Sequence, residues 1–318
     1  MDNATKTEDV LYSDMAYDDA FRTMESECDD LLIPYVNYMF GEHYDSSAVI
    51  TRMRNEHFIE HEDHSNEKRI TDSHFTISQN GMTKRYHLEC ESSKYDNSIL
   101  IRLFEYGSQI AVDTAETGEM TVRLTFPNTG LLLLRGPRSV RDKAVMVIDT
   151  PDGSISSTIP IMKIYDFTIK DIFDQKLYML IPFYIFNYES DLEAINSDEQ
   201  RIEKLQDVYR DILNEIKDLH DGGVLSAFSC GVIINSTRRV LYKLMNKHER
   251  VQEKVGEIMG GKVLDLPEIR IFHEGKEQGR LEGLTEGRAE GEEERKQLEI
   301  EIDSLRKELE QLKNQIPV

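Results

Sequence analysis

The chain has 318 residues, 39% of them hydrophobic and 8% aromatic, which is enough for one sizeable core plus an appendage and argues against disorder. Its 38 basic and 60 acidic residues give a net charge of −22, which argues against a broad basic face for nucleic acid, although a cleft can be locally basic. The three cysteines are widely separated, which excludes a disulfide framework or a structural zinc site built on cysteine.

The first predicted element is a helix over residues 14–40, which Gly41 is expected to end. Its apolar positions recur at helical spacing: Ala20, Met24, Leu31 and Leu32. Strands are predicted within residues 70–92. A second helix is predicted over residues 99–115, after an Asp-Asn-Ser segment that suits a helix start. One face of this helix is expected to carry Ile99, Leu103, Tyr106 and Ile110.

The second half of the chain is predicted to begin with strands and to continue with helices. The strand segments, separated by turns with Pro and Gly, are residues 121–126, 130–134, 144–149 and 159–164. The helical segments lie near residues 170–192, 198–219, 225–248 and 249–259. No secretory signal opens the chain, and the most apolar stretch, residues 177–188, is too short to cross a membrane. We therefore expect a cytoplasmic protein without a membrane partner.

The tail changes character near Gly275. Glycine recurs there at every fourth residue up to Gly291, and each interior glycine costs roughly 1 kcal/mol of helix propensity. Residues 275–297 are therefore predicted to be a weak helix or a flexible arm. The next apolar residues alternate in steps of four and three, as in the seam of a coiled coil: Leu298, Ile302, Leu305, Leu309, Leu312 and Ile316. These heptads predict a homo-oligomer, and a single amphipathic helix docked on the core is the alternative.

The most informative segment is the hairpin around Asn80 and Gly81. This dipeptide is typical of a two-residue type I′ turn, in which both central residues take positive φ. With it at the tip, the numbers of every opposed pair of residues sum to 161, so that Asp72 faces Glu89.

Alternation along the strands divides the hairpin into two faces. One face is apolar and is expected to join the core: Phe75, Ile77, Tyr86, Leu88 and Cys90. The other face is polar: Asp72, His74, Thr76, Arg85, His87, Glu89 and Glu91. Directly opposed carboxylates repel at about 5 Å, at a cost that is small on a solvated face and that a bound cation relieves. The residues alone leave two interpretations open, an exposed polar surface and a Mg²⁺ site.

Several short motifs follow one another in an order that resembles a known family. They are Asp18-x-x-Phe21-Arg22 and residues 55–59, 70–73, 87–93, 101–106, 159–163 and 180–184. With the glutamate-glycine tail, their order resembles the PD-(D/E)XK family transposases related to recombination-promoting nucleases (Rpn), over about residues 14–291. The resemblance implies an α/β fold: a PD-(D/E)XK, restriction-endonuclease-like core with a mixed central sheet flanked by helices. Periodicity and composition add a helical C-terminal region, the glycine-rich arm and a coiled-coil tail. The expected divisions are residues 1–192, 193–274, 275–297 and 298–318.

The resemblance also implies roles for individual residues in the hydrolysis of DNA, in recombination or phage defence. Asp72 and Glu89 would bind Mg²⁺ (or Mn²⁺), with the Cys90 carbonyl as a third ligand, and Asp18 would reach the metal or its waters. Glu91 would take a proton from the attacking water or hold a second cation. The expected substrate-binding residues are Arg102, Tyr106 and Lys94.

Glu91 departs from the family pattern. The superfamily has Lys at this position and this branch usually has Gln, whereas a glutamate supplies no ammonium to polarise water or to steady the transition state. Either Lys68, Lys84 or Lys94 supplies the cation from nearby, or the activity is altered or lost.

Three further hypotheses follow from the same residues. A catalytically degenerate core can act as an oligomeric binding module through the heptads. His74 and His87 can join the carboxylates in a Zn²⁺ or Mn²⁺ site. DNA can bind a basic helix over residues 236–250, for which a solvated helix face is the alternative. Its basic residues are Arg238, Arg239, Lys243, Lys247 and Arg250.

Overall fold

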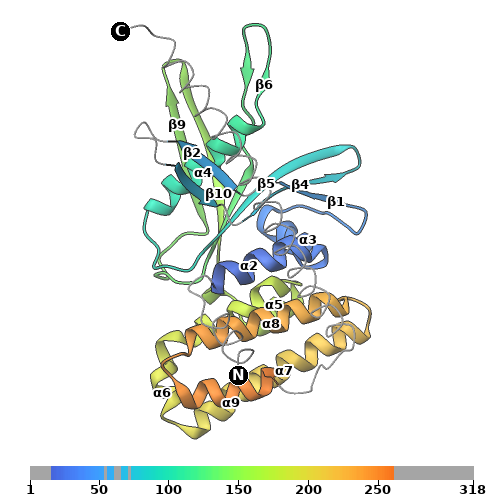
Figure 1. The fold of residues 1–318 in the computed structure, drawn as a ribbon, viewed down its shortest axis with the longest axis vertical. Helices are drawn as coiled ribbons and strands as arrows, with labels where there is room; N and C mark the ends of the chain where they lie inside the picture. The colour runs from blue at the N-terminus through green and yellow to red at the C-terminus, as the bar shows by residue number, and fades with distance from the viewer. Residues whose placement is uncertain (1–15, 54–55, 61–65, 71–72, 261–318) are drawn as a thin grey trace, which may run out of the picture. The chain divides into compact units, whose positions relative to one another are not determined.

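This computed structural model describes residues 16–53, 56–60, 66–70 and 73–260. Its central element is a mixed six-stranded sheet (Figure 1). Its strand order is β1-β4-β5-β8-β10-β9. The strands are β1 (Val49–Arg52), β4 (Ser73–Gln79), β5 (Met82–Glu91), β8 (Asn128–Leu133), β9 (Lys143–Thr150) and β10 (Gly153–Lys163). β5, β8 and β10 are parallel, while β1 and β4 on one side and β9 on the other are antiparallel to their neighbours. The predicted α/β class with a mixed central sheet is confirmed.

Two small hairpins and the helices complete the described elements. The hairpins pair β2 (Glu56–Glu60) with β3 (Asn66–Ile70), and β6 (Glu116–Thr117) with β7 (Val122–Arg123). The first helices are α2 (Ala16–Glu27), α3 (Asp29–Phe40) and α4 (Ser98–Asp113). Those after the sheet are η1 (Ile164–Asp166), α5 (Ile169–Asp174), η2 (Tyr178–Asp191), α6 (Leu192–Asn196), α7 (Glu199–Asp221), α8 (Ala227–Leu244) and α9 (Glu249–Gly260). No helix in the described ranges is long and apolar enough to cross a bilayer.

The turn between β4 and β5 has the predicted chemistry. Asn80 and Gly81 take φ values of 53° and 76°, the positive values that a type I′ turn requires. The register then runs from Gln79 opposite Met82 to Ser73 opposite Leu88, so the predicted pairing is confirmed over this range. Asp72, the glycine-rich tail and the heptads lie outside the described residues.

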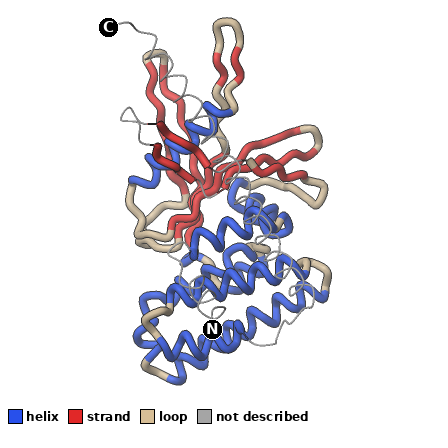
Figure 2. The backbone as a smooth tube through the Cα atoms, viewed as in Figure 1, coloured by secondary structure: helices blue, strands red, loops and turns tan. Residues whose placement is uncertain are grey.

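The apolar face of this hairpin packs against one layer of helices. Phe75, Ile77, Tyr86, Leu88 and Cys90 are all buried, in one cluster with side chains of α2, α3, η2 and α8. Figure 2 shows the helices of this layer in blue beside the red strands. Each fully buried large apolar side chain contributes about 1.5–3 kcal/mol to the stability of the fold. Because this cluster holds most of the buried apolar residues, it provides most of the burial that stabilises the sheet.

Helix α4 covers the other face of the sheet. It lies in the connection between the parallel strands β5 and β8, a pairing that requires a crossover segment. Ile99 and Leu103 of α4 pack on Leu131, Leu133 and Ile161 of the neighbouring strands, and Ile110 is also buried. The predicted helix and its apolar face are therefore confirmed, although Tyr106 is only half-buried.

Gly130 shows how closely the first layer approaches the sheet. A Cβ added to this residue of β8 would lie 2.1 Å from Met39 Sδ and 2.9 Å from Phe40 Cζ. Since real Cβ contacts are never this short, α3 can lie this close to the strand only because residue 130 has no side chain.

Two predicted helices are wrong in their extent. The helix predicted over residues 14–40 is interrupted at Cys28, whose φ and ψ are −128° and 88°. Asp29 and Asp30 follow in the first turn of α3, where acidic residues favour a new helix start. Gly41 ends α3 as predicted, with a φ of 68°. The helix predicted over residues 170–192 is instead the short α5 followed by the 3-10 helix η2, which contains Pro182.

Candidate functional site

The polar face of the hairpin is buried. His74, His87, Glu89 and Glu91 are 4%, 0%, 4% and 9% exposed. The interpretation as an exposed polar surface is therefore wrong for these four residues. α4 closes over this end of the sheet, and alternation along an isolated hairpin does not show which of its faces a later helix will cover.

Glu89 and His87 form the centre of this buried face. They are two residues apart on β5, so their side chains point to the same side, and His87 Nε2 lies 3.2 Å from Glu89 Oε1. Tyr106 of α4 approaches His87 edge to face, with ring centroids 5.8 Å apart. The helix and the strand thus hold an acid, an imidazole and a phenol in direct contact.

Glu91 is fixed by two donors at the end of β5. Its Oε1 accepts a hydrogen bond from the backbone N–H of Ser93 at 2.7 Å, and its Oε2 accepts one from Arg102 Nη2 at 2.6 Å. Both oxygens of this carboxylate are therefore engaged within the chain. A charge-assisted pair of this length is stronger than a neutral hydrogen bond, so Glu91 orients the guanidinium of Arg102.

Arg102 retains donors for a further acceptor. Burial lowers its pKa, but the hydrogen bond and charge of Glu91 and the charge of Glu89 outweigh burial and raise the pKa above its usual value. Its side chain is 41% exposed, whereas its Nε is itself buried and makes no hydrogen bond to the described residues. A permanently charged guanidinium, held by a carboxylate and partly open to solvent, is suited to bind a phosphate.

The structure brings together four of the eight residues of the predicted site. It brings together Glu89, Glu91, Arg102 and Tyr106 on one face of the sheet. The Cys90 side chain points to the opposite face and is buried there. Asp18 lies half-buried on α2, in the layer that covers this opposite face. Lys94 follows the end of β5 and is exposed, and Asp72 lies outside the described residues.

The cation nearest to Glu91 was expected to be a lysine. Lys84 is wrong in this role, because it binds Glu42 at 2.7 Å near the hairpin turn, and seven residues of strand place it about 23 Å from Glu91. Lys68 lies on β3, where the structure describes the backbone alone. Arg102 of α4, which was predicted to bind substrate, takes the position beside Glu91.

The donor set decides which metal ions fit this face. Mg²⁺ requires one or two carboxylates and takes water or phosphate oxygens for its remaining positions. Glu89 supplies one buried carboxylate, and Asp72 is the predicted second. Zn²⁺ usually takes three or four protein ligands. No group of three His, Cys, Asp or Glu side chains placed to bind a metal occurs among the described residues.

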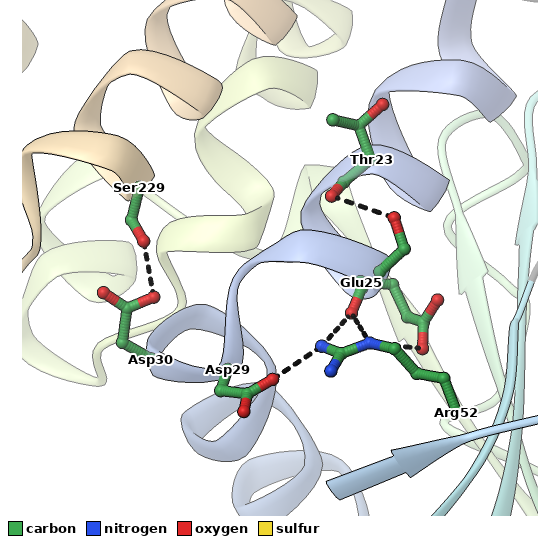
Figure 3. A network of polar contacts seen from close by, with 7 residues as sticks. Thr23, Glu25, Asp29, Asp30, Arg52 and Ser229 are labelled. Carbon is green, nitrogen blue, oxygen red and sulfur yellow. Dashed lines mark hydrogen bonds and ion pairs between the residues drawn. The ribbon is translucent and has the colours of Figure 1, made fainter. Parts of the chain in front are cut away.

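A second polar network joins α2 to the start of the sheet (Figure 3). Arg52 of β1 donates to the backbone carbonyl of Glu25 at 2.6 and 3.0 Å and to the Asp29 carboxylate at 2.7 Å. The Glu25 side chain is 2% exposed, and its Oε1 lies 3.9 Å from Arg52 Nε. Burial raises the pKa of Glu25 to about 7, although Ser73 and Arg52 oppose the rise.

The burial of Glu25 was not predicted from the sequence, although its position on the helix indicates it. It follows Phe21 by four residues and therefore falls on the buried face of α2. A glutamate at such a position is either neutral or paired.

The predicted basic helix over residues 236–250 is wrong. α8 ends at Leu244 and α9 begins at Glu249, so the five basic residues do not share one helix. Arg250 donates to the Asn196 carbonyl at 2.9 Å and pairs with Glu199 at 2.6 Å. Its charge therefore holds α9 to the end of α6 and the start of α7.

Comparison with known proteins identifies no relative: no family model matches the chain, and neither a curated protein nor a solved structure matches it.

Proposed function

We propose that the chain is a metal-dependent endonuclease of the PD-(D/E)XK type that hydrolyses DNA phosphodiesters. The observation that carries the proposal is the buried cluster on β5, where Glu89 contacts His87 and Glu91 holds Arg102 beneath α4. Buried acids beside a partly exposed arginine are costly for folding and are typical of functional sites. A mixed central sheet flanked by helices is also the arrangement that the resemblance implies.

Glu89 and Asp72 would hold Mg²⁺ in this proposal. When bound, the ion supplies a water of lowered pKa and positive charge for the phosphate oxygens. Glu89 contributes a carboxylate whose orientation is fixed by His87, 3.2 Å away. His87 in turn packs against the Tyr106 ring, so the acid is preorganised on a rigid strand and helix.

Arg102 would bind the scissile phosphate and stabilise the charge that grows on it. Its charge is secured by Glu91, and its partly exposed side chain retains donors for an acceptor. In this arrangement Glu91 acts through Arg102 and so replaces the lysine of the superfamily indirectly. Removal of one such donor typically lowers the rate by about a hundredfold or more.

The test is cleavage of supercoiled plasmid in Mg²⁺, Mn²⁺ or EDTA. We expect nicking by the wild type with either metal, and a loss of about a hundredfold in Glu89→Gln, Asp72→Ala and Arg102→Ala. Glu119→Gln removes an exposed carboxylate outside the cluster and is the matched control. No metal-dependent nicking by the wild type would refute the proposal, and full activity in Glu89→Gln would remove this cluster from it.

A catalytically degenerate core that binds partners is the second candidate. It is favoured by Glu91, because both oxygens of this carboxylate already accept a hydrogen bond from within the chain. The heptads of residues 298–316 would then make the homo-oligomer. Inactive wild type that sediments as an oligomer, and as a monomer after Leu305→Glu, would support this function over the nuclease.

A further inference from the structure

A pocket of about 800 Å³ lies at the carboxyl ends of the three parallel strands. It is lined by the segments that follow β5 (Lys94), β8 (Leu134–Arg138) and β10 (Tyr165–Thr168), together with the end of η2. Neither Glu89 nor Glu91 lines it. Open α/β sheets bind ligands outside the carboxyl ends of their strands, and small-molecule pockets measure about 300–1,000 Å³. Its place and size are therefore those of a binding site for a small molecule.

The walls of this pocket are rich in aromatic rings. Its aromatic residues are Tyr165, Phe167, Tyr184, Phe186 and Tyr188. Several are held by other rings or charges. Tyr184 and Tyr188 meet edge to face at 5.9 Å, and the Arg135 guanidinium lies 4.7 Å from the centre of the Phe186 ring. Because Tyr184 and Phe186 are buried, the rings that offer faces to a planar group are the half-buried Tyr165, Phe167 and Tyr188.

Some of the charged residues that line the pocket are already paired with other charged residues. Arg135 is neutralised by Glu189, to which it donates a bifurcated hydrogen bond from Nε and one hydrogen bond from Nη2, and it also donates to the Ser92 carbonyl. Asp166 pairs with Lys163 at 2.8 Å, and the same lysine also pairs with Asp142 at 2.7 Å.

The remaining cations of the pocket are Lys94 and Arg138. Both are exposed, and their side chains form no ion pair or hydrogen bond within the described ranges. Their two segments lie side by side, because a Cβ added to Gly136 would lie 3.4 Å from Tyr95 Cβ. Two unpaired cations at one pocket are notable in a chain of net charge −22. They favour a ligand that brings negative charge.

We propose that this pocket binds a small anionic molecule with a planar ring, of the chemical class of a mononucleotide. The ring would stack on the aromatic walls, and the phosphate would lie between Lys94 and Arg138. The inference does not depend on cleavage of nucleic acid, because the pocket and the carboxylate cluster are lined by different residues.

The test is isothermal titration of the full chain with AMP, adenosine and inorganic phosphate. Since AMP can use both the rings and the cations, we expect it to bind at least about tenfold more tightly than either fragment. Arg138→Glu and Phe167→Leu should each weaken AMP binding by about tenfold. Lys204→Glu, which makes the same charge change on the exposed side of α7, should leave it unchanged.

Three outcomes would overturn the inference. They are no AMP binding at millimolar concentration, equal binding of AMP and phosphate, and equal losses in Arg138→Glu and Lys204→Glu. Glu89→Gln separates the two proposals, because this variant should lose plasmid nicking and keep AMP binding. All of the substituted residues except Phe167 are exposed or belong to the other site, and circular dichroism of Phe167→Leu checks that it folds.

Discussion

Glu25 makes the stability of the protein depend on pH. Its carboxyl group is buried where α2, α3 and the sheet meet, near Arg52 of β1 (Figure 3). Ser73 of β4 and Arg52 lower its pKa, and Asp29 of α3 raises it. Desolvation is the largest of these effects and raises the pKa from an ordinary 4.5 to about 7. The folded protein therefore binds a proton on Glu25 at pH values where the unfolded chain has released it.

The sign and size of the effect follow from this shift. The stabilising contribution of protonated Glu25 is fully present below about pH 4.5 and is lost as the pH rises to about 7, because the folded state must then bury the charge. One unit of pKa corresponds to about 1.4 kcal/mol, so the full loss is about 3 kcal/mol. About 2 kcal/mol of it falls between about pH 5.5 and about pH 8.5.

The substitution Glu25→Gln isolates this contribution, because the amide keeps the shape of the side chain and does not titrate. We expect urea denaturation, followed by circular dichroism, to show wild type losing about 2 kcal/mol relative to Glu25→Gln over this pH range. Glu27→Gln, at the exposed end of the same helix, is the control and should follow the wild type. A constant difference between wild type and Glu25→Gln across the range would refute the reasoning.

Three further predictions are tested by the same denaturation assay. Gly130→Ala should lower the free energy of unfolding by about 3 kcal/mol, because its Cβ would overlap buried atoms, whereas Gly118→Ala, whose nearest contacts are at 3.7 Å, should change it little. Leu103→Ala should cost about 3 kcal/mol and Ile101→Ala, at a position 64% exposed on the same helix, less than about 0.5 kcal/mol. Equal effects within either pair would contradict the described packing. Arg102→Ala should cost about 2 kcal/mol, because it leaves the buried Glu91 carboxylate without its cation.

The hairpin was predictable from sequence because residues that are close together in the chain determine its turn and its register. Asn80 and Gly81 fix the turn, and the turn fixes the register of every pair from Gln79 opposite Met82 outward. The helix predicted over residues 14–40 failed for the opposite reason. Apolar spacing continues through Cys28, and the break there depends on the packing of α2 and α3 as separate helices.

The burial of the polar face was not predictable in the same way. Alternation assigned His74, His87, Glu89 and Glu91 to one face correctly, but whether that face meets water depends on where α4 crosses. This crossing is a long-range property, set by the parallel pairing of β5 with β8. A helical period alone shows that Ile99 and Leu103 share a face, and it does not show which strand they will cover.

The crossing of α4 over the sheet explains how a glutamate can be buried at position 91. A glutamate at the end of β5 would be an uncompensated buried charge if α4 carried no cation at residue 102. The pairing of Glu91 with Arg102 at 2.6 Å removes this cost and brings a partly exposed guanidinium to the edge of the buried acids. In Glu91→Gln, an amide would hold Arg102 less firmly without removing it. If Arg102 binds phosphate, this variant should keep part of the plasmid nicking that Arg102→Ala loses. If Glu91 itself accepts the proton, Glu91→Gln should lose as much activity as Glu89→Gln, and a comparison of the three variants decides between the two roles.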